Sequence, residues 1–259
     1  AFENYAFFGG MPLILSRPYD TARMNYLKSL FSEVYLKDIV ERKSIKREDI
    51  LSATLDLLCS SVGSLTNPNN IANSLNSKQR LTGKNTVAAN TVKAYINYLQ
   101  DAYLFEECRR FDVKGKDYFD YPNKYYCDDL GLRGARIGFR QQEMTHIMEN
   151  IIYNDLRIRG CEVDIGIVYS SEKNKSGHPQ QVAREIDFIA TRGSKKTYIQ
   201  SAYALETEEK AIIENKPFGL TGDSFPKIIV RHDIHKRWYD DNGVLNIGII
   251  DFLLDDTIV

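Results

Sequence analysis

Two pairs of polar residues lie on neighbouring predicted strands, at a spacing that suits divalent-metal chemistry. Glu185 and Asp187 are two residues apart in a predicted strand, so their carboxylates should lie side by side on one face. Two adjacent carboxylates repel each other unless a cation, a basic partner or solvent relieves the repulsion, and Mg²⁺ prefers such oxygens together with waters. Glu149, on a preceding predicted helix, could supply a third carboxylate. Glu149, Glu185 and Asp187 are therefore the predicted ligands of a Mg²⁺ or Mn²⁺ ion.

The next predicted strand carries Tyr198 and Gln200, which share a face in the same way. A neutral phenol is a poor ligand for Mg²⁺, and a glutamine can orient a water but brings no positive charge. Lys195 or Lys196, in the preceding turn, could supply that charge instead. The alternative is an inert remnant whose polar side chains only satisfy one another. Asp187 and Gln200 are the candidate catalytic residues, and the sequence leaves open whether the chain is an enzyme.

The elements that must position these residues are read from apolar periodicity in the C-terminal half. Strands are predicted at 161–168, 182–190, 197–203, 227–231 and 247–254, and helices over 140–159 and from Thr207 onward. Gly160 stands where a helix is expected to end. Because a strand, a helix and another strand follow one another after residue 197, we expect a parallel pairing within a mixed sheet.

The N-terminal half is predicted to be helical. An apolar stripe over 24–39 predicts one long amphipathic helix, and further helices are predicted at 47–61, 67–75 and 86–103. Two strands follow, at 104–111 and 124–127, joined by a turn at 114–117. Three helices and a ribbon are the order of a winged helix-turn-helix, whose third helix can lie in a DNA major groove.

The nucleic-acid hypothesis rests on polar and basic side chains of this module. The predicted nucleic-acid-binding residues are Lys93, Asn97, Arg109 and Arg110, within a stretch from Lys78 to Lys116 in which basic residues outnumber acidic ones. The formal net charge of the whole chain is only -1, so no strong overall field attracts nucleic acid. The alternative is that the module serves as a protein–protein scaffold.

Hydropathy, the cysteines and the first residues indicate the kind of protein and the cellular compartment to expect. Apolar runs such as 247–254 are far shorter than the roughly 20 residues that a membrane span needs, so no membrane partner is expected. The four cysteines are scattered without a CxxC pair, which predicts reduced thiols in a cytoplasmic protein. The chain begins without methionine or a signal-peptide pattern, so we expect a piece of a longer protein.

Several short phrases together resemble the C-terminal region of bacterial and archaeal AAA-type ATPases. They are Gly9-Gly10-Met11-Pro12, Leu36-Lys37-Asp38-Ile39, Asn90-Thr91-Val92 with Tyr95-Ile96-Asn97-Tyr98-Leu99, Asp129-Leu130-Gly131-Leu132-Arg133, Glu149-Asn150-Ile151-Ile152-Tyr153 and Glu185-Ile186-Asp187-Phe188. The resemblance implies an α+β fold, in which an N-terminal helical winged-helix-like domain precedes a mixed α/β PD-(D/E)XK nuclease-like domain. It implies a segment 1–46 that leads to an ATPase module, a winged-helix-like domain 47–133 and a nuclease-like domain 134–259.

The family pattern also implies roles for the site residues. Glu149, Asp187 and Gln200 are the positions of a degenerate nuclease site, and Tyr198 stands where that pattern has a metal-binding acid. No GxxxxGK[ST] phosphate-binding loop occurs in these 259 residues, so no ATP site of that kind is expected in the chain. The expected partner is the N-terminal ATPase module of the same full-length protein, with DNA as a second one.

Three functional hypotheses follow from these observations. The first is a DNA-associated or regulatory region of an AAA-type ATPase with little or no cleavage. The second is a protein-interaction module that docks the ATPase or another chain without binding nucleic acid. The third is an active Mg²⁺- or Mn²⁺-dependent DNA endonuclease. Salt-sensitive DNA binding, a stable complex with the ATPase, and metal-dependent cleavage distinguish the three.

Overall fold

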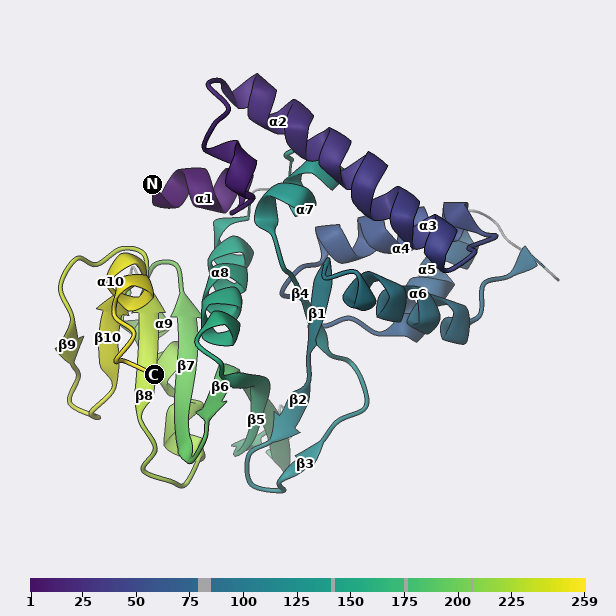
Figure 1. Cartoon of the computed structure of the whole chain (residues 1–259). Helices are drawn as coiled ribbons and strands as arrows, with labels where there is room; N and C mark the ends of the chain where they lie inside the picture. Colours follow the sequence, from purple (N-terminus) through teal and green to yellow (C-terminus); the bar gives the residue numbers. More distant parts are fainter. Residues whose placement is uncertain (79–84, 141–142, 175–176, 206) are drawn as a thin grey trace. The chain divides into compact units, whose positions relative to one another are not determined.

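The computed structural model describes residues 1–78, 85–140, 143–174, 177–205 and 207–259, and its architecture is mixed α+β (Figure 1). The chain forms two compact units. The first comprises Ala1–Glu107 and Tyr121–Asn150, and the second comprises Cys108–Asp120 and Ile151–Val259. None of the described helices has the length and apolar character that crossing a bilayer requires.

The first unit is mostly helical, and its long N-terminal helix is confirmed. The α-helix α2 (Asp20–Ser29), the π-helical segment η2 (Leu30–Leu36) and α3 (Lys37–Arg42) follow one another without a break (Figure 1). The predicted helices at 47–61, 67–75 and 86–103 are confirmed as α4 (Glu48–Ser60), α5 (Pro68–Lys78) and α6 (Ala89–Asp101). The other helices of this unit are α1 (Phe2–Phe8), the 3-10 turn η1 (Pro12–Ile14) and α7 (Leu130–Arg136).

Local sequence explains where these helices begin and which face they bury. Pro68 opens α5, and the Asn67 side chain accepts a hydrogen bond of 2.8 Å from the amide of Asn69. On α6 the residues Val92, Ile96 and Leu99 are fully buried, at the spacing of one helix face.

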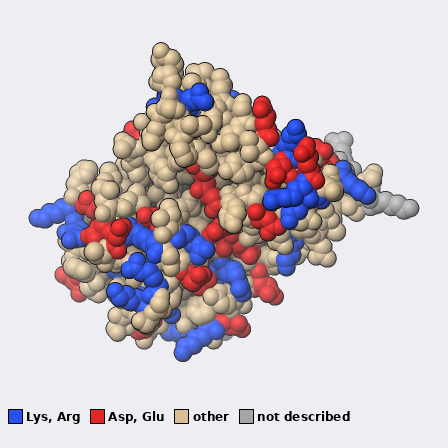
Figure 2. Space-filling model, viewed as in Figure 1, with Lys and Arg blue, Asp and Glu red and all other residues tan. Residues whose placement is uncertain are grey.

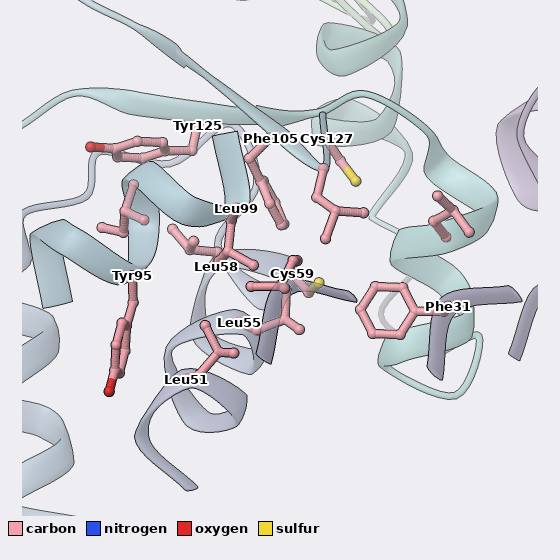
Figure 3. Packing of buried hydrophobic residues seen from close by; sticks show 14 of the residues in the cluster. Phe31, Leu51, Leu55, Leu58, Cys59, Tyr95, Leu99, Phe105, Tyr125 and Cys127 are labelled. Carbon is pink, nitrogen blue, oxygen red and sulfur yellow. The ribbon is translucent and has the colours of Figure 1, made fainter. Parts of the chain in front are cut away.

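The core of the first unit lies between α4, α6 and a two-stranded sheet of β1 (Phe105–Cys108) and β4 (Lys124–Cys127). Figure 3 shows Leu51, Leu55 and Leu58 of α4 packed near Leu99 of α6 and Phe105 of β1. The predicted ribbon is thus formed by these two strands.

The second unit is built on an eight-stranded mixed sheet within the described residues, in the order β3-β2-β5-β6-β7-β8-β10-β9. Its strands are β2 (Arg110–Asp112), β3 (Asp117–Tyr118), β5 (Glu162–Lys173), β6 (Pro179–Arg192), β7 (Lys195–Ala202), β8 (Lys227–Arg231), β9 (Trp238–Tyr239) and β10 (Leu245–Gly248). Helix α8 (Met144–Ile158) precedes β5, and α9 (Glu208–Asn215) connects β7 to β8. The pairing of β7 with β8 is parallel, which confirms the predicted crossover.

The predicted strand at 247–254 is wrong over most of its length. Strand β10 ends at Gly248, and the chain continues as helix α10 (Ile249–Leu254). Ile249 and Phe252 are buried while Ile250 and Leu254 are 55% and 80% exposed, which is the spacing of a helix. A short, mainly apolar run fits a buried strand as well as a helix, so periodicity alone could not separate them.

The two compact units also differ from the predicted segments 1–46, 47–133 and 134–259. The predicted strand 104–111 divides into β1, which pairs with β4, and β2, which pairs in parallel with β5 at Arg110 opposite Ile165. Hydrogen bonds of β2 therefore place residues 108–120 with the second unit. Residues 134–150 belong to the first unit.

Candidate functional site

A β-bulge in β6 lies at the predicted site. In the antiparallel pairing with β5, Ile186 stands opposite Gly166 and Ile189 stands opposite Asp164. Two residues of β6, Asp187 and Phe188, therefore face the one residue of β5 between those pairs. Ile186 and Ile189 consequently enter the same apolar cluster although they are three residues apart. A bulge redirects the side chains of a strand, and here it sets the direction of the Asp187 carboxylate.

Asp187 and Gln200 are brought together, and each completes a main-chain hydrogen bond. The ladder between β6 and β7 ends at Phe188 opposite Ile199. Beyond that pair, Oδ2 of Asp187 accepts a hydrogen bond of 2.8 Å from the amide of Ser201, and Oε1 of Gln200 accepts one of 3.4 Å from the amide of Asp187. Both side chains are 8% exposed. The two residues therefore replace ladder hydrogen bonds where the strands separate.

Sequence reasoning missed a second carboxyl group beside Gln200. Glu214 of α9 accepts a hydrogen bond from the Gln200 side chain. Burial raises the pKa of the Glu214 carboxyl, and the hydrogen bond from Gln200 opposes part of that rise. The signal that could have found Glu214 is topological, because a crossover helix between parallel strands packs on the sheet that contains them.

The raised pKa of Glu214 gives a testable pH dependence. At a pH below the ordinary pKa of a glutamate, the Glu214 carboxyl is protonated in both the folded and the unfolded chain. As the pH rises the unfolded chain ionises first, so the free energy of unfolding falls until the folded carboxyl ionises too. Glu214→Gln should therefore stabilise the protein at pH 7 by less than about 1 kcal/mol, since the group is partly exposed and water screens its charge. The gain should vanish below about pH 4 in thermal unfolding curves; a gain that persists at pH 3 would contradict this origin.

Tyr198 replaces the acidic residue that the resemblance to nucleases leads one to expect, and its side chain is buried and hydrogen-bonded to another residue. Its ring is 0% exposed, and its hydroxyl donates a hydrogen bond of 2.6 Å to Oδ2 of Asp223. Burial raises the pKa of the phenol, and the hydrogen bond to the Asp223 carboxylate raises it further. A phenol held neutral in this way does not offer the oxyanion that a hard metal ion needs.

Glu149 is buried within the first unit and bonded to two residues of β4. Its Oε1 accepts hydrogen bonds from Nζ of Lys124 at 2.8 Å and from the hydroxyl of Tyr126 at 2.5 Å. Lys124 and Glu149 are 5% and 8% exposed, so this is a buried ion pair. The His146 ring lies nearby, with Nδ1 3.9 Å from Oε2 of Glu149. The carboxylate of Glu149 is thereby paired with a cation of its own unit.

The predicted metal set is divided between the two units. Glu149 belongs to the first unit, whereas Glu185 and Asp187 lie on β6 of the second. Glu185 stands opposite Ile167 in the ladder between β5 and β6. In the described ranges, no group of three or more histidine, cysteine, aspartate or glutamate side chains is placed to hold a metal ion. A site made of Glu149, Glu185 and Asp187 stays a prediction.

The predicted nucleic-acid-binding residues also fall into two pairs. Lys93 and Asn97 are exposed on one face of α6, four residues apart, in the first unit. In the second unit, the guanidinium of Arg109 lies 4.0 Å from the ring centroid of Tyr118. That of Arg110 lies 4.8 Å from the ring centroid of Phe119. The two arginines are thus held against aromatic rings.

Charge is mixed over the visible surface. Figure 2 shows lysine and arginine side chains interspersed with aspartate and glutamate on the viewed face. Arg80 and Lys84 of the basic stretch lie outside the described residues. Contact with a polyanion would therefore depend on particular cations, and a field of one sign over the whole surface does not arise.

Two phrases distant in the sequence meet in the first unit. Asp129 begins α7, and its Oδ1 accepts a hydrogen bond of 2.8 Å from the amide of Leu132. Its Oδ2 accepts one of 2.7 Å from the amide of Gly10. A Cβ atom added to Gly131 would stand 1.9 Å from the carbonyl oxygen of Phe8, so only glycine allows this approach. The chain after α1 is therefore fastened to the start of α7.

The segment that contains this contact matches a family model. Residues 1–143 match the model of a domain of unknown function, DUF8612. The chain belongs to the DUF8612 family. The family region includes α1 to α7 together with the contact between Gly10 and Asp129, and it ends before β5 to β10 of the second unit.

Two uncharacterized proteins are similar to the chain. An uncharacterized protein of Haemophilus influenzae is 28% identical over 258 residues, which cover 98% of this chain and 58% of that protein. The uncharacterized protein MJ1544 of Methanocaldococcus jannaschii is 27% identical over 203 residues, which cover 78% of this chain and 42% of that protein. The chain thus spans about half the length of these relatives. The crystal structure of protein VC1899 from Vibrio cholerae is 12% identical, covers 90% of this chain and 54% of that one, and gives a TM-score of 0.27.

Proposed function

We propose that the chain is the DNA-associated regulatory region of an AAA-type ATPase, and that its nuclease-like site does not cleave DNA. The proposal is supported by the hydrogen bonds that the site residues already make. Asp187 and Gln200 complete main-chain hydrogen bonds, and Tyr198 is bonded to Asp223. Phosphodiester hydrolysis at such a site needs metal-binding carboxylates and a cation that stabilises the developing charge. Here Asp187 and Gln200 instead make hydrogen bonds that join β6 to β7.

The DNA-binding part of the proposal is supported by the first unit. Helices α4, α5 and α6 followed by β1 and β4 have the order of a winged helix-turn-helix, and α6 corresponds to its third helix. Lys93 and Asn97 are exposed on α6, while Val92 and Ile96 are buried on the face turned to the core. We therefore expect α6 to make the principal DNA contact.

Replacement of Lys93 tests this directly. Lys93→Ala together with Asn97→Ala should weaken binding of duplex DNA about 5- to 10-fold at low salt, because one phosphate contact and one polar contact are lost. The salt dependence of log K should also become shallower by about one. Fluorescence anisotropy at several salt concentrations measures both. Lys28→Ala removes an exposed charge from α2 of the same unit and should leave binding unchanged. DNA binding that is undetectable at low salt, or equal loss in both variants, would exclude this role of α6.

The absence of cleavage is tested with the candidate metals. Wild-type protein and Asp187→Asn are incubated with single-stranded, nicked and duplex DNA in Mg²⁺ or Mn²⁺. We expect no metal-dependent product in the wild type beyond that of the variant. Product that forms with the wild type and disappears in Asp187→Asn would replace the proposal with an active endonuclease.

A second candidate function is favoured by an exposed apolar corner between α1 and α2. Leu13, Leu15 and Tyr19 are 51%, 90% and 73% exposed there. Exposed apolar side chains that are close in sequence are typical of protein contacts. We propose the ATPase module of the same full-length protein as their partner. A stable complex with that module, formed by a chain that does not bind DNA, would select this function over the first.

A further inference from the structure

A pocket of about 820 Å³ lies at the end of the second unit's sheet where β8 begins. Its walls come from α9, from the 3-10 turn η4 (Phe218–Leu220) and from the loop that leads to β8. Phe218 and Val244 line its floor but are each only 2% exposed and belong to the buried cluster of the second unit, so the accessible apolar side chain is Ile212, which is 67% exposed. This volume is in the range of small-molecule sites, which combine apolar walls with a few polar groups.

The polar groups of the pocket suit a heterocyclic base and a phosphate. Asn215 and Asn242 line it, and a carboxamide can both donate to and accept from the edge of a base. Lys216 and Lys227 line it as well. Among the contacts that the structure describes, Nζ of Lys227 donates hydrogen bonds only to the main-chain carbonyls of Asp223 and Phe225 and not to a carboxylate.

The carboxylates near these lysines already accept hydrogen bonds from other side chains. Glu172 accepts hydrogen bonds from Lys216 at 2.7 Å, from Arg184 at 2.6 Å and from Ser170 at 2.9 Å. These contacts, led by that from Lys216, lower the pKa of Glu172 to about 2. Asp223, the carboxylate that lines the pocket, accepts a hydrogen bond from the Tyr198 hydroxyl. Counted with Arg184, the two lysines supply three positive charges against the two carboxylates Glu172 and Asp223, which leaves one positive charge in excess beside the pocket.

Basic and aromatic side chains continue beyond it. Nζ of Lys196 lies 5.4 Å from the ring centroid of Phe225 and 6.0 Å from that of Phe111. Phe225 is 40% exposed. A Cβ atom added to Gly222 of the lining would stand 3.7 Å from Cε of Lys114, which brings a further lysine to the rim. Surfaces that hold single nucleic-acid strands combine cations with aromatic rings in this way.

We propose that this pocket binds a nucleoside phosphate unit. The base lies against Ile212 within reach of the two asparagine amides, and the phosphate is bound by Lys216 and Lys227. The same chemistry is offered by a free nucleotide and by a nucleotide within single-stranded DNA. The site goes beyond the proposed function, because it lies in the second unit and does not depend on Lys93.

The test uses the full 259-residue chain and two probes, fluorescein-labelled (dA)₁₂ and unlabelled dAMP as a competitor. Gly219 lines the pocket, and a Cβ atom there would meet nothing within 4 Å, so Gly219→Phe should fill the pocket without displacing the main chain. Lys216→Met removes one cation and keeps the length of the side chain. Each change should weaken binding about tenfold. The matched controls are Ile213→Phe, at a 60% exposed position of α9, and Lys236→Met at an exposed lysine; each should change binding less than twofold.

The outcomes separate the possible sources of the ligand. Competition by dAMP at low millimolar concentration identifies a free nucleotide as sufficient, whereas binding of (dA)₁₂ alone identifies a strand. The proposal is overturned if neither probe binds at low salt, or if Lys216→Met and its control behave alike. It is also overturned if Lys93→Ala abolishes binding of (dA)₁₂ while both pocket variants retain it. That last result would uphold the proposed function and assign all DNA binding to α6. Thermal unfolding of each variant establishes that it is folded.

Discussion

Replacing Lys124 with methionine is expected to lower the free energy of unfolding by about 3–5 kcal/mol. The ammonium of Lys124 lies 2.8 Å from Oε1 of Glu149, and both residues are almost fully buried. Methionine has a similar length and no charge, so the Glu149 carboxylate would keep only the Tyr126 hydroxyl as a strong donor among the contacts described for it. An uncompensated charge in a buried site is far more costly than the loss of an exposed pair. Urea unfolding followed by far-ultraviolet circular dichroism measures the change.

A matched pair of variants separates burial from charge loss. Lys43 forms an ion pair of 2.6 Å with Asp101, and these side chains are 26% and 55% exposed. Lys43→Met should therefore cost less than about 1 kcal/mol. The double variant Lys124→Met with Glu149→Leu removes both buried charges and should recover much of the stability that Lys124→Met alone loses. Equal costs for the two lysine variants, or a double variant as unstable as the single one, would contradict a buried ion pair.

Gly131→Ala should destabilise the first unit by about 2–4 kcal/mol. The new Cβ atom would stand 1.9 Å from the carbonyl oxygen of Phe8 and 2.5 Å from its carbonyl carbon. Both are main-chain atoms, so no rotamer change relieves the clash, and α1 must move away from α7. That movement also breaks the hydrogen bond between Gly10 and Asp129. Urea unfolding measures the cost, and limited proteolysis reports release of the segment around α1.

Helix propensity alone predicts the opposite sign for this change. Gly131 lies within α7, where alanine is favoured over glycine by roughly 1 kcal/mol. A Gly131→Ala variant that is more stable than the wild type would therefore refute the close approach of Phe8. Gly219→Ala is the control, because a Cβ atom at that position has nothing within 4 Å and should change stability by less than about 1 kcal/mol.

The fastened N-terminus gives physical meaning to the phrases that carry the family resemblance. Gly9-Gly10 and Asp129-Leu130-Gly131 are parts of one contact, in which Asp129 supplies two acceptor oxygens and Gly131 supplies the space. Burial raises the pKa of the Asp129 carboxyl, while its main-chain donors oppose that rise. These residues are used for packing. The region matched by the DUF8612 model therefore carries a structural contact.

Local patterns in the sequence were sufficient for most helices and for the positions of the central strands along the chain. The stripe over 24–39, Pro68 after Asn67, and the turn at Gly193-Ser194 between β6 and β7 each encode structure within a few residues. The parallel crossover from β7 through α9 to β8 also followed from element order alone. The adjacency of Asp187 and Gln200 follows from the same strand assignments.

Other features depended on partners that are distant in the chain. Whether residues 249–254 form a strand or a helix depends on which side chains the sheet buries, and β2 leaves the ribbon because β5 offers it a parallel partner. The hydrogen bonds of Asp187, the buried pair of Lys124 with Glu149, and the approach of Phe8 to Gly131 join separate elements. Carboxylates at suitable spacing therefore indicated a nuclease-like pattern from the sequence. The tertiary structure decided how they are used, because a carboxylate's partners are set by packing across the fold.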